Sequence, residues 1–307
     1  MMTLKTASTT ILITAMALIP ACGPSDENAE PEELEPIAAE PLSLEPRFKV
    51  ETEIDPGVRV DPPETPPALR WDFSEVKTIA YELFQAYETS TAIEIPPELM
   101  GELPPNAKSE ATLIVRSEGD GTAVVEIHDA SVYLGDEEQP TERQPGLVAT
   151  IGRMDESGQV QPSELQNGHS GSGHAEQFLS LLISLPNEPL RPGESLEDTL
   201  ELPIPQELPG FELSLRREIT LLGYEMRNGE RCAKLEVALT PEDADLPEGV
   251  SPGIQFGFDG KSVVLFGIES RTFASAEMTI AMGFAGIMQV DMMMKMERKS
   301  GDSEDTP

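Results

Sequence analysis

Hydrophobic and polar residues alternate with period two near the end of the chain. The odd positions include charged residues such as Glu277, Asp291 and Lys295. Because successive side chains of a strand point to opposite faces, the pattern predicts two strands with one apolar face, reversed near residues 283–286. The even positions are Met278, Ile280, Met282, Phe284, Met288, Val290, Met292, Met294 and Met296.

Further strands are predicted where apolar runs are separated by turn signals. Residues 111–116 and 123–128 flank Gly119-Asp120-Gly121, and Asn228-Gly229 separates residues 213–223 from 231–239. Asp-Gly and Asn-Gly accept the positive φ that tight hairpins need. A turn is also predicted at Asp259-Gly260, ahead of a strand at 261–266, and short strands are predicted at 131–134 and 147–151. The fold class is therefore mainly β, with antiparallel curved sheets or a half-barrel.

Two segments involve helical periodicity. In residues 76–87, the apolar side chains fit a helical stripe and also fit one face of a strand, so periodicity alone leaves both open. The compact apolar run at 175–185 ends before Pro186 and predicts one short buried helix.

The layout predicted from composition has five parts. Residues 1–21 have the short charged start, apolar run and small residue of a secretory signal peptide. Residues 22–68, rich in Pro and Glu, predict a disordered tether with a short apolar patch at 48–50. A β lobe at 69–165 and a second at 166–300 follow, as two lobes or one long sheet, before a disordered tail at 301–307.

The segment Leu18-Ile19-Pro20-Ala21-Cys22 resembles the lipobox of bacterial lipoproteins. That resemblance implies lipidation of Cys22 and attachment to the membrane through the N-terminal lipid. Gly23 stands where an Asp would imply inner-membrane retention, so the expected localisation is the outer membrane, facing the periplasm or the cell surface. An ordinary signal peptide with an unrelated cysteine is the alternative.

Composition disfavours two classes of binding partner, nucleic acids and sugars. The chain has 307 residues and a formal net charge of −35, which disfavours nucleic acid because phosphate binding needs clustered Lys and Arg. Aromatic residues make up 5% of the chain, few for a sugar-stacking protein. If Cys22 carries lipid, Cys232 has no partner for a disulfide within the chain.

The run from Leu185 to Ser195, Leu-Pro-Asn-Glu-Pro-Leu-Arg-Pro-Gly-Glu-Ser, resembles a pattern in uncharacterised bacterial envelope lipoproteins. In these a Trp follows, where this chain has Leu196. The resemblance extends over about residues 69–298 and implies a curved antiparallel sheet similar to the half-barrels of lipoprotein carriers. It favours a strand at 76–87 and implies no activity.

Candidate catalytic residues are sparse. His169 and His174 lie in a Gly- and Ser-rich segment that lacks the glycine of a nucleophile elbow and a third metal ligand at recognisable spacing. They are weak candidates for metal ligands, and the alternative interpretation is an ordinary solvated loop. His128 and Cys232 are interpreted as sheet residues. No cofactor is expected, and the protein is not expected to be an enzyme, with hydrolysis a distant third function.

The methionine-rich face is the most suggestive surface. Methionine is flexible and polarizable, so such a face can adapt to varied apolar partners. Its positions would either line a groove for an acyl chain or a partner helix, or form ordinary core beneath the helix at 175–185. The leading hypothesis is a lipid-anchored module that binds or scaffolds an envelope protein without catalysis; a carrier of an apolar ligand is the alternative. The candidate ligand-binding residues are Met278, Met282, Met288, Met292, Met294 and Met296.

Overall fold

The structure is a computed structural model in which most of the chain from residue 44 onward is described. The described residues are 44, 46–55, 57–91, 106–135, 140, 142–162, 179, 181–182, 185–203, 212–245, 256–284 and 288–299.

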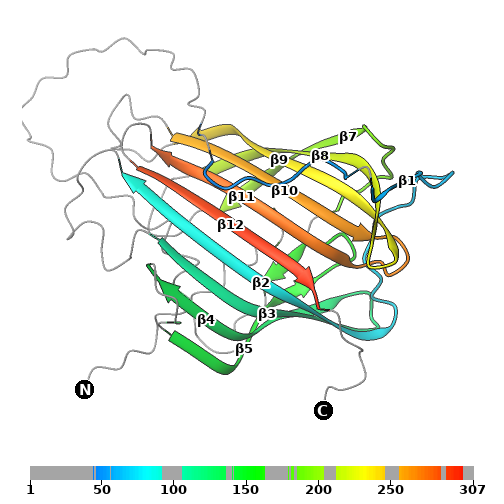
Figure 1. Ribbon diagram of the computed structural model, residues 1–307, viewed down its shortest axis with the longest axis horizontal. Coiled ribbons are helices and arrows are strands. Elements are labelled where there is room, and N and C mark those ends of the chain that lie inside the picture. Colours follow the sequence, from blue (N-terminus) through cyan, green and yellow to red (C-terminus); the bar gives the residue numbers. More distant parts are fainter. Residues whose placement is uncertain are drawn as a thin grey trace, which may run out of the picture.

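One antiparallel sheet contains all the strands of the described residues (Figure 1). Its spatial order is β1-β8-β9-β10-β11-β12-β2-β3-β4-β5-β6, and β7 also pairs with β8. The strands are β1 Arg59–Val60, β2 Val76–Thr91, β3 Asn106–Glu118, β4 Ala123–Leu134, β5 Glu142–Met154, β6 Val160–Pro162, β7 Ser195–Pro203, β8 Glu212–Arg227, β9 Glu230–Asp245, β10 Phe256–Gly267, β11 Phe273–Phe284 and β12 Met288–Arg298.

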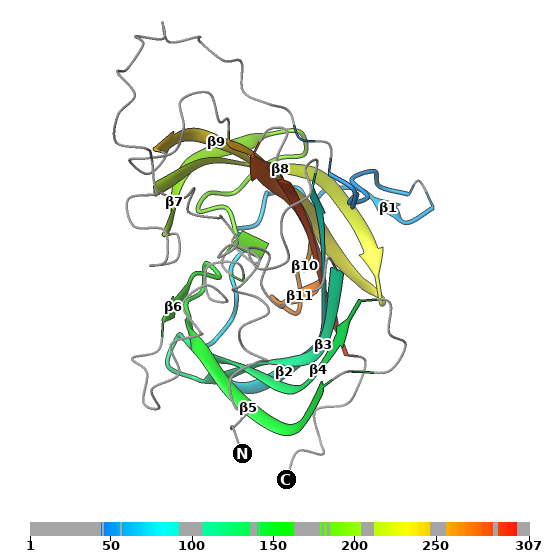
Figure 2. The same cartoon turned by 90° about the vertical axis from the view of Figure 1, so that its left-hand side faces the viewer.

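The sheet consists of two meanders. Strands β2 to β6 form one meander and β8 to β12 another, and β12 pairs with β2 to join them. That junction is long, because it runs from Met288 opposite Thr91 to Arg298 opposite Tyr81. Figure 2 shows the sheet curving so that β6 and β7 approach from opposite ends of the strand order. The sheet is not closed into a barrel.

The predicted fold class is confirmed. Residues 76–87 belong to strand β2, so the helical alternative is wrong there. The Asn228-Gly229 hairpin is also confirmed: both residues have positive φ, 53° and 79°, between β8 and β9. Leu179, Leu181 and Leu182 are helical and buried, in agreement with the short helix predicted at 175–185.

The turn predicted at Asp259-Gly260 is wrong. Both residues lie inside β10, where Gly260 is paired with Leu239 of β9 and Ile280 of β11. A Cβ at Gly260 would lie 3.0 Å from the Cβ of Leu239 and 3.1 Å from the ring of Phe258. Glycine is therefore needed for close packing on the sheet and not for a reversal of the chain.

The sheet has an apolar inner face and an outer face that is polar except for a small buried cluster of Cys232, Leu265 and Ala274. The main hydrophobic cluster gathers the inward residues of nearly every strand with Trp71, Phe73 and the helical leucines. In Figure 2, a short green helical segment lies inside the curve, in the colour range of residues near 180. The concave side is therefore the inner face, and the helical leucines pack within it.

The end of the predicted tether lies on the outer face. Residues 44, 46–55 and 57–60, here called the strap, cross β12 to β8 (Figure 1, blue), and β1 at their end pairs with β8. Leu44 and Ile54 are buried. Two buried apolar side chains and a strand pairing outweigh the polar composition that predicted a free chain. Residues 22–43 of the tether, which include Cys22, lie outside the described residues, as do the signal peptide and the tail at 301–307.

Candidate functional site

The methionine-rich face lies at the centre of the inner face, on β11 and β12. Alternation places their even positions inward, and the antiparallel register sets Met278 opposite Met294 and Ile280 opposite Met292. The next strands continue the rows, because Met294 is opposite Gln85 of β2 and Met278 is opposite Ser262 of β10. Thioether side chains are therefore paired directly at Met278 and Met294, and the other inward methionines lie opposite different residue types.

Most of these methionines are buried. Met278, Met282, Met288, Met294 and Met296 are at most 8% exposed and belong to the main hydrophobic cluster. Met292 is the exception, being only partly buried against that cluster. Among the described residues outside the strands, the side chains packed in the same cluster are few: Leu69, Trp71, Phe73, Leu179, Leu181, Leu182, Leu185 and Leu190.

An aromatic cluster closes one end of the inner face. The Trp71 ring stacks on Phe73 at 5.5 Å between centroids and meets the edge of Phe273 at 4.8 Å. Backbone bonds hold this segment in place: the amide of Trp71 donates to the carbonyl of Glu156, and Phe73 accepts from Gly121. Offset-stacked and edge-to-face geometries are the favoured arrangements of aromatic pairs. This end of the face is thus fixed by packing.

A charged pair interrupts the apolar surface. Arg217 of β8 alternates with Leu215 and Ile219, which places its side chain on the inner face. Its Nε donates a 2.7 Å hydrogen bond to Oδ1 of Asp198 on β7, and its Nη2 donates to Oδ2. The sequence reasoning missed this pair, although the parity of the predicted strand at 213–223 would have revealed an inward arginine.

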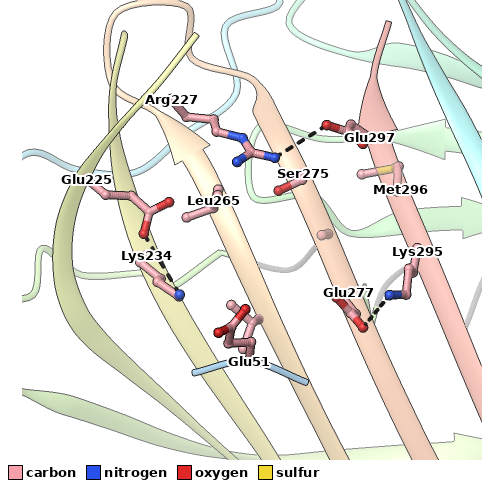
Figure 3. Close-up of a pocket in the computed structure, with 12 residues that line it drawn as sticks. Glu51, Glu225, Arg227, Lys234, Leu265, Ser275, Glu277, Lys295, Met296 and Glu297 are labelled. Carbon is pink, nitrogen blue, oxygen red and sulfur yellow. Dashed lines mark hydrogen bonds and ion pairs between the residues drawn. The ribbon is translucent and has the colours of Figure 1, made fainter. Parts of the chain in front are cut away.

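A second candidate site lies on the outer face, beneath the strap. It is a cavity of about 320 Å³ between Glu51 of the strap and strands β8 to β12 (Figure 3). Three cations line it, and each faces a carboxylate: Lys234–Glu225 at 3.8 Å, Lys295–Glu277 at 2.9 Å and Arg227–Glu297 at 3.5 Å. Because Glu51 adds a fourth carboxylate to these three pairs, the cavity offers no preference for an anionic ligand.

The strap is held over this cavity at both ends. The backbone N–H of Arg47 donates to the buried Asp291 at 3.0 Å, while Lys234 donates through Nζ to the carbonyl of Glu53 at 2.6 Å. Ile54 lies near Gly223, where an added Cβ would be 2.9 Å from its terminal carbon. The outer-face site is therefore built from the strap as well as the sheet.

The remaining predicted residues form no catalytic arrangement in the part of the chain that is described. His128 lies with its Nε2 3.2 Å from Oε2 of Glu126, which also accepts from Arg116. Burial raises the pKa of the Cys232 thiol to about 12, so it is a poor nucleophile at neutral pH. His169 and His174 lie outside the described residues, within which no group of three or more His, Cys, Asp or Glu could hold a metal.

Comparison with known proteins gives structural likenesses but no match to a family model or to a curated sequence. Among solved structures the chain is similar to lipovitellin, in a structure titled "Lipid-protein interactions in lipovitellin", with a TM-score of 0.43 and 13% identity. The likeness covers 77% of this chain and 26% of the lipovitellin chain, a minor part of that protein. At this score a shared fold is not established.

Membrane-spanning helices are long and apolar. Within the described ranges, no helix is long and apolar enough to cross a membrane.

Proposed function

We propose that the protein binds the hydrocarbon chain of a lipid on the inner face of its sheet and acts as a carrier without catalysis. The observation that supports this most directly is the set of inward-pointing methionines on β11 and β12, with Met292 only partly buried among them. A tight core favours branched side chains with defined rotamers, whereas methionine repacks around different shapes. The face is therefore suited to an apolar partner that varies in shape.

The burial of the methionines beneath other side chains determines how a ligand would reach them. A hydrocarbon chain would replace part of the cover supplied by Leu179, Leu181 and Leu182, which lie on a short helical segment and not in the sheet. Exchanging one apolar contact for another leaves little net change in buried apolar area, so the exchange requires no unfolding of the sheet.

We also propose that the carrier is attached to the bacterial outer membrane through lipid on Cys22. This rests on the lipobox resemblance, and two or three acyl chains hold a protein at a membrane almost irreversibly. Cys22→Ala is expected to abolish metabolic labelling with a radioactive fatty acid. Persistent labelling of the variant would contradict the anchor.

Displacement of a fluorescent fatty acid tests the carrier proposal. The full chain with Cys22→Ala, which lacks acyl groups of its own, is titrated with cis-parinaric acid and then with palmitate. We expect saturable binding that palmitate reverses. Met292→Gln should weaken binding about tenfold, because a polar amide would face the hydrocarbon chain.

Met293→Gln is the matched control. Met293 is the next residue of β12 and points to the outer face, opposite Thr279 and Ala86. Its substitution should leave probe binding unchanged. Absence of saturable binding by the parent chain, or equal losses in the two variants, would contradict binding on the inner face.

A scaffold for an envelope protein is the second candidate, and one observation favours it. Strand β5 pairs with β6 only over residues 152–154, so its edge from Glu142 to Ile151 has no further strand partner among the described residues. Val148 on this strand is 58% exposed. Exposed strand edges are templates for pairing with another chain. Pull-down from envelope extracts that depends on Val148 and occurs without lipid binding would favour the scaffold.

A further inference from the structure

Arg217 is a buried cation on the face that otherwise suits hydrocarbon. Its side chain is 6% exposed, and it lies opposite the buried Leu239 of β9. Its neighbours along β8 on the same face are Leu215 and Ile219, 0% and 1% exposed. The guanidinium is therefore held in place by apolar packing.

The partner of Arg217 is less constrained. Asp198 lies on β7, which pairs only with β8 among the described strands, and its side chain is 37% exposed. Rotation of the Asp198 carboxylate toward solvent would leave the guanidinium in position with two donors available. The pair is therefore asymmetric, with a fixed cation and a displaceable anion.

The free energy of folding gives no reason to keep a buried ion pair at these two positions. Replacing a buried ion pair with apolar residues of similar volume is often neutral or stabilising, because both charges lose their hydration. Leu196 and Leu200, which flank Asp198 on the same face of β7, pack against the main cluster. An apolar pair at 198 and 217 would continue that packing.

The position of the pair matches the length of a hydrocarbon chain. Register connects Arg217 through Leu239, Gly260 and Ile280 to Met292 in one row across the sheet. The row spans four strand spacings, about 19 Å at about 4.8 Å each along the sheet. The acyl chains of one leaflet cover about half of the roughly 30 Å bilayer core, so a single acyl chain fits between the two residues.

We infer that Arg217 recognises the carboxylate of a long-chain fatty acid whose hydrocarbon chain extends along the row to Met292. This rests on the proposed carrier function and adds the chemical class of the ligand. Arg217 already holds a carboxylate, that of Asp198, through two parallel N–H···O bonds, and a fatty-acid carboxylate has the same shape and charge. Asp198 then acts as the resident anion that the ligand replaces.

Paired ligands with the same chain length test the inference. Palmitate, hexadecanol and hexadecyl phosphate are titrated against a neutral fluorescent probe bound to the full Cys22→Ala chain. We expect palmitate to bind about ten- to a hundredfold more tightly than hexadecanol, as charge-assisted hydrogen bonds imply. Arg217→Gln should remove that preference by weakening palmitate binding far more than hexadecanol binding. Hexadecyl phosphate binding more tightly than palmitate would overturn the carboxylate assignment.

Two further variants keep the result decisive. Asp198→Asn removes the competing charge but keeps Arg217, so palmitate affinity should rise; an unchanged affinity would overturn the displacement. Arg216→Gln is the matched control, because Arg216 is the exposed neighbour on the opposite face. If the parent chain binds palmitate and hexadecanol equally, the head-group inference fails while the carrier proposal stands. If it binds neither, the carrier proposal itself fails.

Discussion

The backbone N–H of Arg47 donates a 3.0 Å hydrogen bond to Oδ1 of Asp291, a residue 244 positions further along the chain. The Asp291 carboxylate is 1% exposed and also accepts from Nε2 of Gln289. This buried carboxylate on the outer face thus fixes the first part of the strap, and the strap in turn covers the outer-face cavity.

Removal of this carboxylate should release the strap. Asp291→Ala is expected to lower the free energy of unfolding by about 1–3 kcal/mol, because the Arg47 amide loses its acceptor. Trypsin should then cleave faster after Arg47 and Lys49. Glu88→Gln is the control: the Arg47–Glu88 pair is solvent-exposed, at 52% and 41%, and is worth about 0–1 kcal/mol. Unchanged cleavage in Asp291→Ala would show that the strap is held by other contacts.

The Lys234–Glu225 pair under the strap should show strong coupling. Both side chains are 9% exposed, with Nζ and Oε2 3.8 Å apart. Lys234→Met alone should destabilise the protein by about 3–5 kcal/mol, since it leaves a buried carboxylate without its cation. The double variant Lys234→Met/Glu225→Gln should recover most of that loss in urea unfolding. Additive losses would mean that the two groups are independently solvated.

Trp71 should dominate the stability of the closed end of the inner face. It is 1% exposed and is the one tryptophan of the sequence, so its fluorescence reports on this cluster alone. Trp71→Ala should cost about 3–5 kcal/mol in unfolding followed by circular dichroism. Trp71→Phe, which keeps a ring against Phe73, should cost less. Red-shifted tryptophan emission in the native protein would contradict burial of this residue.

Alkaline pH should destabilise the protein in part through Cys232. Burial raises the pKa of its thiol to about 12 from an ordinary 9.0. Between these values the unfolded chain loses the thiol proton while the folded chain keeps it, so stability is retained below about pH 9 and falls as the pH rises toward about 12.

Urea unfolding of the parent chain and Cys232→Ala at increasing pH measures this contribution. The parent should lose more stability than the variant above about pH 9. Iodoacetamide at about pH 8 should modify Cys232 only after unfolding. Rapid modification of the native protein would show that the thiol is accessible.

The sequence predicted the features that are governed by local chemistry. The even-numbered apolar positions from Met278 to Met296 determine which face of β11 and β12 is buried, and Asn228-Gly229 specifies its hairpin through positive φ. Gly260 misled the prediction, because the same residue type serves a turn or a close packing contact, and only the neighbouring Leu239 distinguishes them.

Features that depend on distant parts of the chain were not predictable. The pairing of β12 with β2 and the docking of Ile54 near Gly223 join segments whose local patterns are independent. The candidate site was predicted in part, since the methionines were identified from their period. Arg217 was missed because its burial and its ion pair depend on Asp198 in another strand and on the apolar cluster around both.

The central claim is that the inner face binds one hydrocarbon chain, and native mass spectrometry tests it most directly. The full chain with Cys22→Ala would be purified without detergent from the bacterial envelope in which it is produced, alongside Met292→Gln and Met293→Gln. We expect the parent and Met293→Gln to carry a non-covalent adduct with the mass of one fatty acid or acyl lipid, and Met292→Gln to carry much less. Recovery of the folded parent chain at its ligand-free mass alone, with no adduct after incubation with palmitate, would contradict the claim.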